Sequence, residues 1–363
     1  MDGADAWRGS ECRLSNSMEE LHMAYTTLTN RLSLLVFASL VGAMIHAPVY
    51  AGPQPTGPGP AWAKLAPVPT DGTGVEGMSV ANVGDTIIAA LGLDSVDGDT
   101  VTTRLYSIAH DTWSLGADAP GPSSEGAGVA HGGLFYNVGG RIGGPGSAAR
   151  SDIWSYDLEA DAWDATLTPM PTARAGLAIA VVGDSIYAIG GRSATAGPCR
   201  FIRGAPLALV ERYDISSDTW TAVAPLLAPR SDLAAAVVGG KIYVFGGCDA
   251  AGAILADVDV YDPRTDTWSA APADMPTARA GMYAVTTKGD TVYVIGGWDG
   301  IGNGLSTNEA YKVSKNTWTA GLLAMPTPRA EAGAAATGGR IYIVGGSQPA
   351  FGASVNANEA FKP

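Results

Sequence analysis

The chain has 363 residues and carries 22 Lys and Arg against 35 Asp and Glu, which gives a formal net charge of −13 at neutral pH. Charged residues make up 16% of the chain, fewer than the ~25% usual in soluble proteins, and 48 residues are glycine. Because phosphate binding needs clustered cations, this acidic balance argues against nucleic acid as a partner.

The first 51 residues differ from the rest of the chain. From Met23 a short polar stretch with Arg31 leads into the apolar run LSLLVFASLVGAMI, and VYA follows, ending at Ala51. This order is typical of a secretory signal peptide. The apolar run is shorter than the ~20 residues that cross a membrane, although an uncleaved anchor is the alternative. We expect a non-native or cleaved leader at 1–22 and a signal peptide at 23–51.

With this leader removed, the protein is expected to be secreted or periplasmic and to keep no stable membrane span. Export also changes the expected state of the cysteines, because oxidising compartments favour disulfides. Cys199 and Cys248 lie in the loops of neighbouring repeat units and are the candidate pair. Two free thiols are the alternative, since a disulfide needs Cα atoms within ~7 Å.

Beyond the leader, one phrase recurs six times. A strand-like run follows a turn and ends in a glycine pair, as in GGKIYVFGG, and one copy has decayed to GDTIIAALG. The last glycine recurs every 48 to 56 residues, at Gly92, Gly140, Gly191, Gly247, Gly297 and Gly346. A period near 50 indicates a propeller array rather than a solenoid of helix pairs.

A tyrosine and a tryptophan seven residues apart accompany five of these phrases. Each unit also contains four strand-like runs separated by polar turns, as at 174–182, 186–189, 209–215 and 218–223. We expect the glycine pair to leave room for the tyrosine and tryptophan of the outer strands, because glycine has no Cβ atom. The aromatic pairs are Tyr106 and Trp113, Tyr156 and Trp163, Tyr213 and Trp220, Tyr261 and Trp268, and Tyr311 and Trp318.

The combination of glycine pair, tyrosine and tryptophan, with an entry segment such as MPTARAG before it, resembles the kelch repeat. The resemblance covers the chain from Trp62 to Phe361. It implies an all-β, six-bladed kelch β-propeller over 52–363. The last unit ends at NEAFKP without a tryptophan strand, and an unused strand-like segment surrounds Trp62. We therefore expect the N-terminal strand to close the last blade, and we expect a monomer.

Arginines at equivalent positions in the last four units are candidate ligand-binding residues. Several guanidiniums converging on one mouth would suit a carboxylate or another anion, because arginine offers paired donors in a planar fork. The kelch resemblance implies the same use. The alternative is that each arginine bonds backbone carbonyls of its own loop. The four residues are Arg174, Arg230, Arg279 and Arg329, where the first two units have Val75 and Ser123.

Two further residues follow glycine pairs on the same face. Arg192 opens the longest loop, and Trp298 lies outside the tryptophan position of the repeat. Exposed Arg and Trp side chains often anchor binding surfaces, so both join the predicted site. For Trp298 the alternative is a hydrophobic side chain that plugs its own loop.

Catalysis has less support. Kelch copper oxidases resembling galactose oxidase need two His and two Tyr around the metal, whereas the exported chain has only His110 and His131, which lie apart. We exclude that reading and predict no metal and no cofactor. A sialic acid (N-acetylneuraminate) mutarotase is the alternative, because its chemistry needs only an acid/base carboxylate and a cation. The carboxylates available to it are Glu76, Glu125, Glu211 and Glu331.

No motif assigns catalytic residues for that alternative. The function we favour is an exported binding module that is not an enzyme. It would recognise a protein or glycan partner through one mouth of the propeller, with an anionic group as the favoured ligand.

Overall fold

The computed structural model describes residues 59–94, 98–143, 147–193, 204–270, 272–287, 289–301, 303–348 and 353–363. They belong to one compact unit, Val49–Pro363. The predicted leader and signal peptide, 1–22 and 23–51, lie outside the described residues. Apart from the 3-10 turn η1 at Val313–Lys315, the regular elements of these described residues are β-strands. No described helix has the length and apolar character that a membrane span needs.

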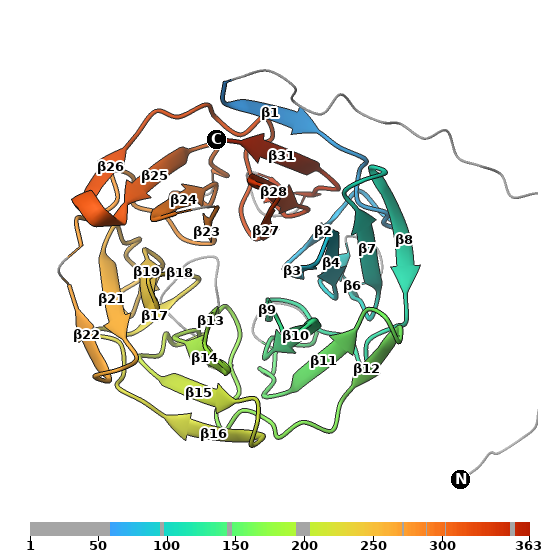
Figure 1. The fold of residues 1–363 in the computed structure, drawn as a ribbon, viewed down its shortest axis with the longest axis horizontal. Helices are drawn as coiled ribbons and strands as arrows, with labels where there is room; N and C mark the ends of the chain where they lie inside the picture. Colours follow the sequence, from blue (N-terminus) through green and yellow to red (C-terminus); the bar gives the residue numbers. More distant parts are fainter. Residues whose placement is uncertain are drawn as a thin grey trace, which may run out of the picture. The chain divides into compact units, whose positions relative to one another are not determined.

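Within the described ranges the main strands form six four-stranded antiparallel sheets, and Figure 1 shows them around a common centre. The predicted all-β class is confirmed. In the first five sheets the strands follow the chain from the centre outward, as β3(Ser79–Val83), β4(Thr86–Ala90), β7(Thr103–Ser107) and β8(Thr112–Gly116); β9(Ala127–His131), β10(Leu134–Val138), β11(Ile153–Asp157) and β12(Ala162–Asp164); β13(Ala178–Val182), β14(Ser185–Ile189), β15(Val210–Asp214) and β16(Thr219–Ala222); β18(Ala234–Val238), β19(Lys241–Phe245), β21(Val258–Asp262) and β22(Thr267–Ser269); and β23(Tyr283–Thr286), β24(Thr291–Ile295), β25(Asn308–Lys312) and β26(Thr317–Thr319).

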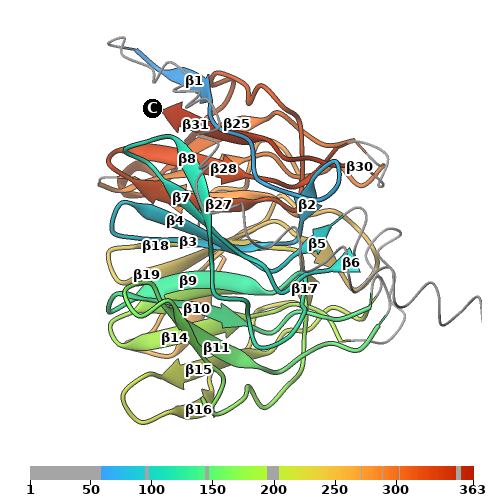
Figure 2. The ribbon, with the colours of Figure 1, turned by 90° about the vertical axis from the view of Figure 1, so that its right-hand side faces the viewer.

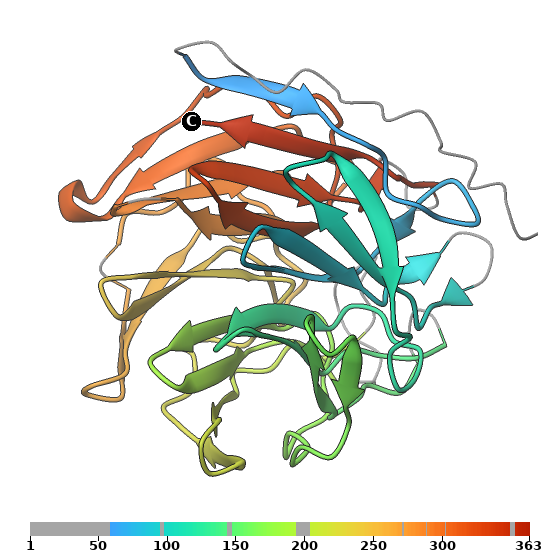
Figure 3. The same cartoon turned by 45° about the vertical axis from the view of Figure 1, so that its right-hand side comes forward.

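The sixth sheet joins strands from both ends of the described chain. Its inner three strands are consecutive: β27(Gly333–Thr337), β28(Arg340–Val344) and β31(Asn358–Lys362). The outermost, β1(Ala61–Lys64), pairs antiparallel with β31 and sets Trp62 opposite Phe361. Figure 3 shows β1, in blue, along the outer side of this sheet. The N-terminal segment thus occupies the position where the other sheets carry their tryptophan strand.

Short strands gather on one side of the sheets (Figure 2). They come from the segment before an inner strand and from the loop after a glycine pair, and we call this side the loop face. Residues next to these strands therefore share one end of the central axis. The short strands are β2(Val75–Glu76), β5(Leu93–Asp94) and β6(Gly98–Asp99); β17(Arg230–Ser231) and β20(Cys248–Asp249); and β29(Ser347–Gln348) and β30(Ala353–Ser354).

At the outer edge, each tyrosine–tryptophan pair fastens its sheet to the preceding one. Tyr213 and Trp220 lie opposite each other with ring centroids 5.0 Å apart. The Tyr213 hydroxyl donates to Asp218 (2.6 Å), which accepts the N–H of Thr168 (2.8 Å). Trp220 Nε1 donates to the carbonyl of the same Thr168 (2.8 Å). We call this set of bonds a rim latch, and it recurs at Tyr106, Tyr156, Tyr261 and Tyr311.

The glycine pairs also join neighbouring sheets, which differs from our expectation. The N–H of Gly191 donates to the carbonyl of Arg230 in the next sheet (2.9 Å). Gly190 has φ 59°, and a Cβ there would lie 2.7 Å from that carbonyl oxygen. The space is therefore filled by the backbone of the next sheet, not by the outer tyrosine and tryptophan. The same bond runs from Gly92 to Ser123, Gly140 to Arg174, Gly247 to Arg279, Gly297 to Arg329 and Gly346 to Val75.

Candidate functional site

The four repeated arginines are buried. Their exposed fractions are 0% for Arg174, Arg279 and Arg329 and 3% for Arg230. Each forms an ion pair with a carboxylate on the third strand of its own sheet. The pairs are Arg174 with Glu211 (3.0 Å), Arg230 with Asp259, Arg279 with Glu309 (2.9 Å) and Arg329 with Glu359 (2.7 Å).

Arg279 illustrates how such a pair is held. Its Nη2 lies 2.9 Å from Glu309 Oε2 and donates to the carbonyl of Val294 at 3.0 Å. The hydroxyl of Thr277 donates to Glu309 Oε1 at 2.7 Å. Burial lowers the pKa of the Arg279 guanidinium, and the charge of Glu309 opposes that shift. The arginine therefore connects the entry segment to the second and third strands of its sheet.

This geometry shows that the prediction of an anion-binding site formed by the four arginines is wrong. Arg174, Arg230, Arg279 and Arg329 are turned into their own sheets, where their charges are matched and solvent is excluded, so they have no accessible donors for a ligand. The sequence did contain a signal for this role. The acids occur two residues before the aromatic of the third strand only in the four units that have the arginine; the first two units have Arg104 and Trp154 there.

Trp298 is buried as well. It is 2% exposed and packs with Cys248, Ala280 and Ala330. Its backbone exchanges two hydrogen bonds with Ala280, of 2.9 and 3.2 Å. The side chain therefore plugs its own loop, which corrects the prediction that it anchors a ligand.

Of the predicted cysteine pair, only Cys248 can be followed. It is fully buried and enters a disulfide. Cys199 lies outside the described residues, so the pairing of these two cysteines stays a prediction.

A circuit of six backbone hydrogen bonds surrounds the central axis on the loop face. In each sheet the residue two positions after the arginine position donates its N–H to the carbonyl of its equivalent in the preceding sheet, at 2.8 to 3.1 Å. All six have φ between 52° and 62°, the left-handed region that normally favours glycine. We call this circuit the axial ring. Its members are, in order, Gly77, Glu125, Gly176, Asp232, Gly281 and Glu331.

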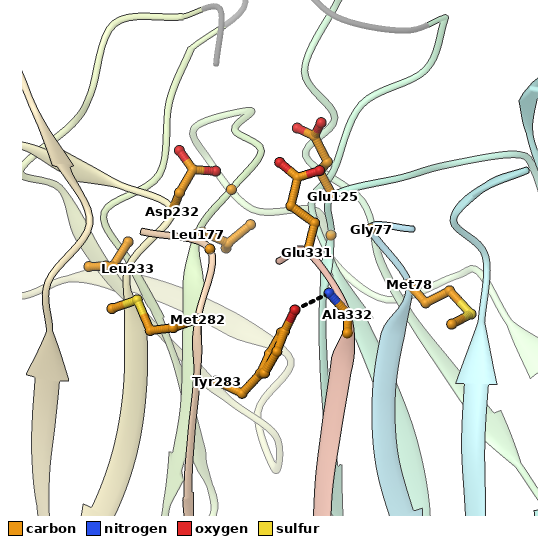
Figure 4. Close-up of a pocket in the computed structure, with 13 residues that line it drawn as sticks. Gly77, Met78, Glu125, Leu177, Asp232, Leu233, Met282, Tyr283, Glu331 and Ala332 are labelled. Carbon is orange, nitrogen blue, oxygen red and sulfur yellow. Dashed lines mark hydrogen bonds between the residues drawn. The ribbon is translucent and has the colours of Figure 1, made fainter. Parts of the chain in front are cut away.

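Glycine and acid alternate around the axial ring, and the ring surrounds a cavity of about 120 Å³. We call it the axial cavity. Figure 4 shows the carboxylates of Glu125, Asp232 and Glu331 together at one end, with the Tyr283 ring below them. The Tyr283 hydroxyl oxygen accepts the N–H of Ala332. The glycines leave the ring open, while the acids give its loop-face end a negative charge.

Two arginine side chains form ion pairs with these carboxylates from one side of the axial ring. Arg192, a predicted site residue, pairs with Glu125 Oε2 and with Asp232 Oδ1. Arg141 pairs with the other oxygen of Glu125 at 2.5 Å. Arg192 is 4% exposed, so it organises the acids and presents no free guanidinium to a ligand. The prediction placed Arg192 in the correct region but with the wrong role.

The two arginines affect the carboxylates unequally. Although burial opposes its charge, Arg192 and Arg141 hold the pKa of Glu125 below its usual value. Burial raises the pKa of Asp232 despite Arg192. Burial, with the charges of Glu76, Glu125 and Asp232, raises the pKa of Glu331 well above its usual value. Glu331 is therefore the acid whose negative charge is least compensated.

The sequence explains why arginines compensate the carboxylates on only one side of the axial ring. Arg141 and Arg192 directly follow the glycine pairs of the second and third sheets, whereas the other four sheets carry Leu93, Cys248, Trp298 and Ser347 there. Burial also raises the pKa of Glu76, which a hydrogen bond with Ser347 partly offsets. In the described part of the chain, no three His, Cys, Asp or Glu side chains are grouped as a metal ion requires.

Part of this site is predicted from the sequence. Glu76, Glu125 and Glu331 are among the predicted residues, but only as carboxylates for the alternative enzyme, and Asp232 is not among them. The alternation of glycine and acid two residues after each arginine position was readable in the sequence. The prediction does not include this alternation because it assigns ligand binding to the arginines.

Comparisons with known proteins agree with the repeat. The model described as the KLHDC2/KLHL20/DRC7 Kelch-repeats domain matches residues 126–346. Kelch-like protein 25 of Xenopus laevis is 33% identical over 146 residues, 40% of this chain and 24% of that protein. Kelch-like protein 36 of Bos taurus is 32% identical over 171 residues, 46% of this chain and 26% of that protein. The matched part thus spans about a quarter of the length of these relatives.

Proposed function

The chain belongs to the family of the KLHDC2/KLHL20/DRC7 Kelch-repeats domain, and we propose that it is an exported, six-bladed kelch propeller that binds a protein partner at the axial cavity. The single observation that carries the proposal is the axial ring. Three of its six members are acids held in a glycine-like backbone conformation around an open cavity on the loop face. The fold alone would be satisfied by glycine at all six positions.

Export rests on the signal-peptide layout of 23–51, and six blades with closure rest on the sheet pattern. The pairing of β1 with β31 supports a closing role for the N-terminal strand. So does the hydrogen bond from Gly77 to Glu331, which links the first sheet to the sixth. A closed ring would hold the axial acids at fixed positions, which favours recognition by a preformed site.

A protein partner is favoured over a glycan, and binding over catalysis. Trp298, the aromatic side chain that a sugar ring would have stacked on, is buried in its own loop. A mutarotase for N-acetylneuraminate would need a cation for the carboxylate of the sugar, and the four repeated arginines are buried in ion pairs. An acidic cavity also repels an acidic sugar. A monomeric state remains our expectation.

Selection from a random peptide display library on the purified full chain tests this function. We expect enriched peptides that bind the wild-type protein. They should also bind Glu159→Arg, because Glu159 is exposed in the outer turn between β11 and β12. They should not bind Glu331→Arg, which makes the same change of charge but fills the axial cavity. Recovery of no binding peptide, or equal binding to both variants, would contradict a partner site at the cavity.

A further inference from the structure

The negative charge of the axial cavity exceeds what its arginines compensate. Arg141 and Arg192 use both oxygens of Glu125 and Oδ1 of Asp232. The carboxylate of Glu331 makes no hydrogen bond or ion pair with any described residue, and its surroundings add three further carboxylates within electrostatic range: Glu76, Glu125 and Asp232. Four acids therefore share two guanidiniums.

A second observation is independent of the charge count. The Asp232 side chain is 7% exposed, and its Oδ2 is buried without a hydrogen-bond partner. The neighbouring Ser231 hydroxyl lowers the pKa of Asp232, although its contact falls short of normal hydrogen-bond geometry. Figure 4 shows the Asp232 carboxylate at the same end of the cavity as Glu331. Because a buried polar atom without a partner is costly, the incomplete pairing of Asp232 adds to the negative charge that the axial cavity leaves uncompensated.

The arrangement also indicates where a hydrogen-bond donor to Glu331 would lie. The compensating arginines enter from the second and third sheets, whereas Glu331 belongs to the sixth and Glu76 to the first. A donor on the axis would reach Glu331 while leaving the pairs of Arg192 intact. The glycines at Gly77 and Gly281, on either side of Glu331 in the ring, carry no side chains that would obstruct it.

The size of the cavity limits the group that it can accept. A cavity needs about 10–15 Å³ to hold one water molecule, and the axial cavity measures about 120 Å³. It therefore has room for the head group of one long side chain with some water, but not for an element of secondary structure. A guanidinium or ammonium group carries a positive charge and several N–H donors, which is what the free carboxylate oxygens lack.

We propose that the axial cavity receives one basic side chain, the guanidinium of an arginine or the ammonium of a lysine, from the protein partner. The proposal deepens the function proposed above and reverses the charge expected from the sequence, which favoured an anionic ligand. The bound cation supplies the positive charge that the first and sixth sheets do not provide. Glu331 is the acceptor of the bound cation, and the nearby charge of Asp232 strengthens the attraction.

The first test uses small probes and needs no partner. Binding of methylguanidinium and of butylammonium to the full chain is measured by ligand-observed NMR at physiological salt, with methylurea as the uncharged comparison. We expect both cations to bind and methylurea not to bind. Glu331→Gln should weaken cation binding about tenfold, the loss expected for one charge-assisted hydrogen bond. Glu159→Gln, which changes the net charge equally at an exposed position, should leave binding unchanged.

Three results would overturn the proposal. They are equal binding of methylurea, equal weakening in both variants, and complete displacement of the probes by an equimolar amount of Ca²⁺, which would indicate a metal site instead. A circular dichroism spectrum of Glu331→Gln that matches the wild type excludes misfolding as the cause of weaker binding.

The second test separates this inference from the proposed function. In each selected peptide that binds the cavity, arginine is replaced by citrulline and lysine by acetyl-lysine, which keep the length but remove the charge. Loss of binding supports the basic side chain. Peptides that bind wild-type protein but not Glu331→Arg, and that contain no arginine or lysine, would overturn the inference while the proposed function stands.

Discussion

Two sets of buried charges in this protein are organised in opposite ways. The four repeated arginines each have their own carboxylate within the same sheet, and both partners of every pair are almost fully buried. The axial acids instead share Arg141 and Arg192, and Glu331 has no partner among the described residues. The arginine–carboxylate pairs, which are neutralised within one sheet, stabilise the fold. The axial carboxylates lie where the sheets meet and are only partly neutralised, so they are available to bind a ligand.

The largest effect should come from breaking a matched pair. Arg279→Ala leaves Glu309 buried without its counter-charge, which typically costs about 3–5 kcal/mol of unfolding free energy. Chemical denaturation of the full chain measures this loss. The double variant Arg279→Met with Glu309→Leu should lose less than Arg279→Ala, because no uncompensated charge remains. A loss below about 1 kcal/mol in the single variant would contradict the structural role of the arginines.

A rim latch should contribute less. Tyr261→Phe removes the hydroxyl that donates to Asp266 (2.7 Å) and should lower the unfolding free energy by about 1–2 kcal/mol. Because this bond lowers the pKa of Asp266 in the folded state, the contribution is present above the usual pKa of aspartic acid. It is lost as the pH falls through the folded-state value.

Denaturation of wild type and Tyr261→Phe at neutral and acidic pH checks that direction. Tyr243→Phe is the control, since burial raises the pKa of Tyr243 with no hydrogen bond contributing. It should leave stability nearly unchanged. If the two variants lose the same stability at neutral pH, the latch hydroxyls have no special role.

The smallest effect is expected at the axis, and it has the opposite sign. Burial and neighbouring acids raise the folded-state pKa of Glu331, so the folded chain holds this proton more tightly than the unfolded chain does. The resulting stability is present below the usual glutamic acid pKa of about 4.3 and is lost as the pH rises through the raised value.

Glu331→Gln should therefore raise the melting temperature at alkaline pH but not near pH 4. Melting curves of wild type, Glu331→Gln and the exposed control Glu159→Gln measure this difference. A lower melting temperature for Glu331→Gln at alkaline pH would show that the axial acid stabilises the fold.

The sequence predicted the repeated parts of the structure well. The spacing of Tyr213 and Trp220 correctly indicated paired outer strands, and the glycine pairs correctly marked strand ends. The tyrosine–tryptophan spacing and the glycine pair each recur in five of the six units, because each sheet meets the same physical requirements. The predicted role of the glycines, to leave room for the outer tyrosine and tryptophan, was wrong. The atoms that crowd the glycines belong to the next sheet, which the sequence of a single repeat does not contain.

The site was harder to predict because its residues interact between repeats. Whether Arg279 faces a ligand or a carboxylate depends on Glu309, 30 residues later, and on the register between three strands. Trp298 was expected at the surface because it departs from the repeat, yet its loop folds back over it. Asp232 gains its role only when six equivalent residues meet at the axis.

The carboxyl carbon-13 NMR titration of Glu331 in the full chain, with and without methylguanidinium, tests most directly whether the axial cavity binds a cation. We expect a pKa well above the usual value in the free protein, because no cation in the described part of the chain pairs with this carboxylate. We also expect a fall of that pKa when the probe binds. A pKa at the usual value that the probe does not change would mean that the charge of Glu331 is already compensated, and it would contradict a cation site at the axial cavity.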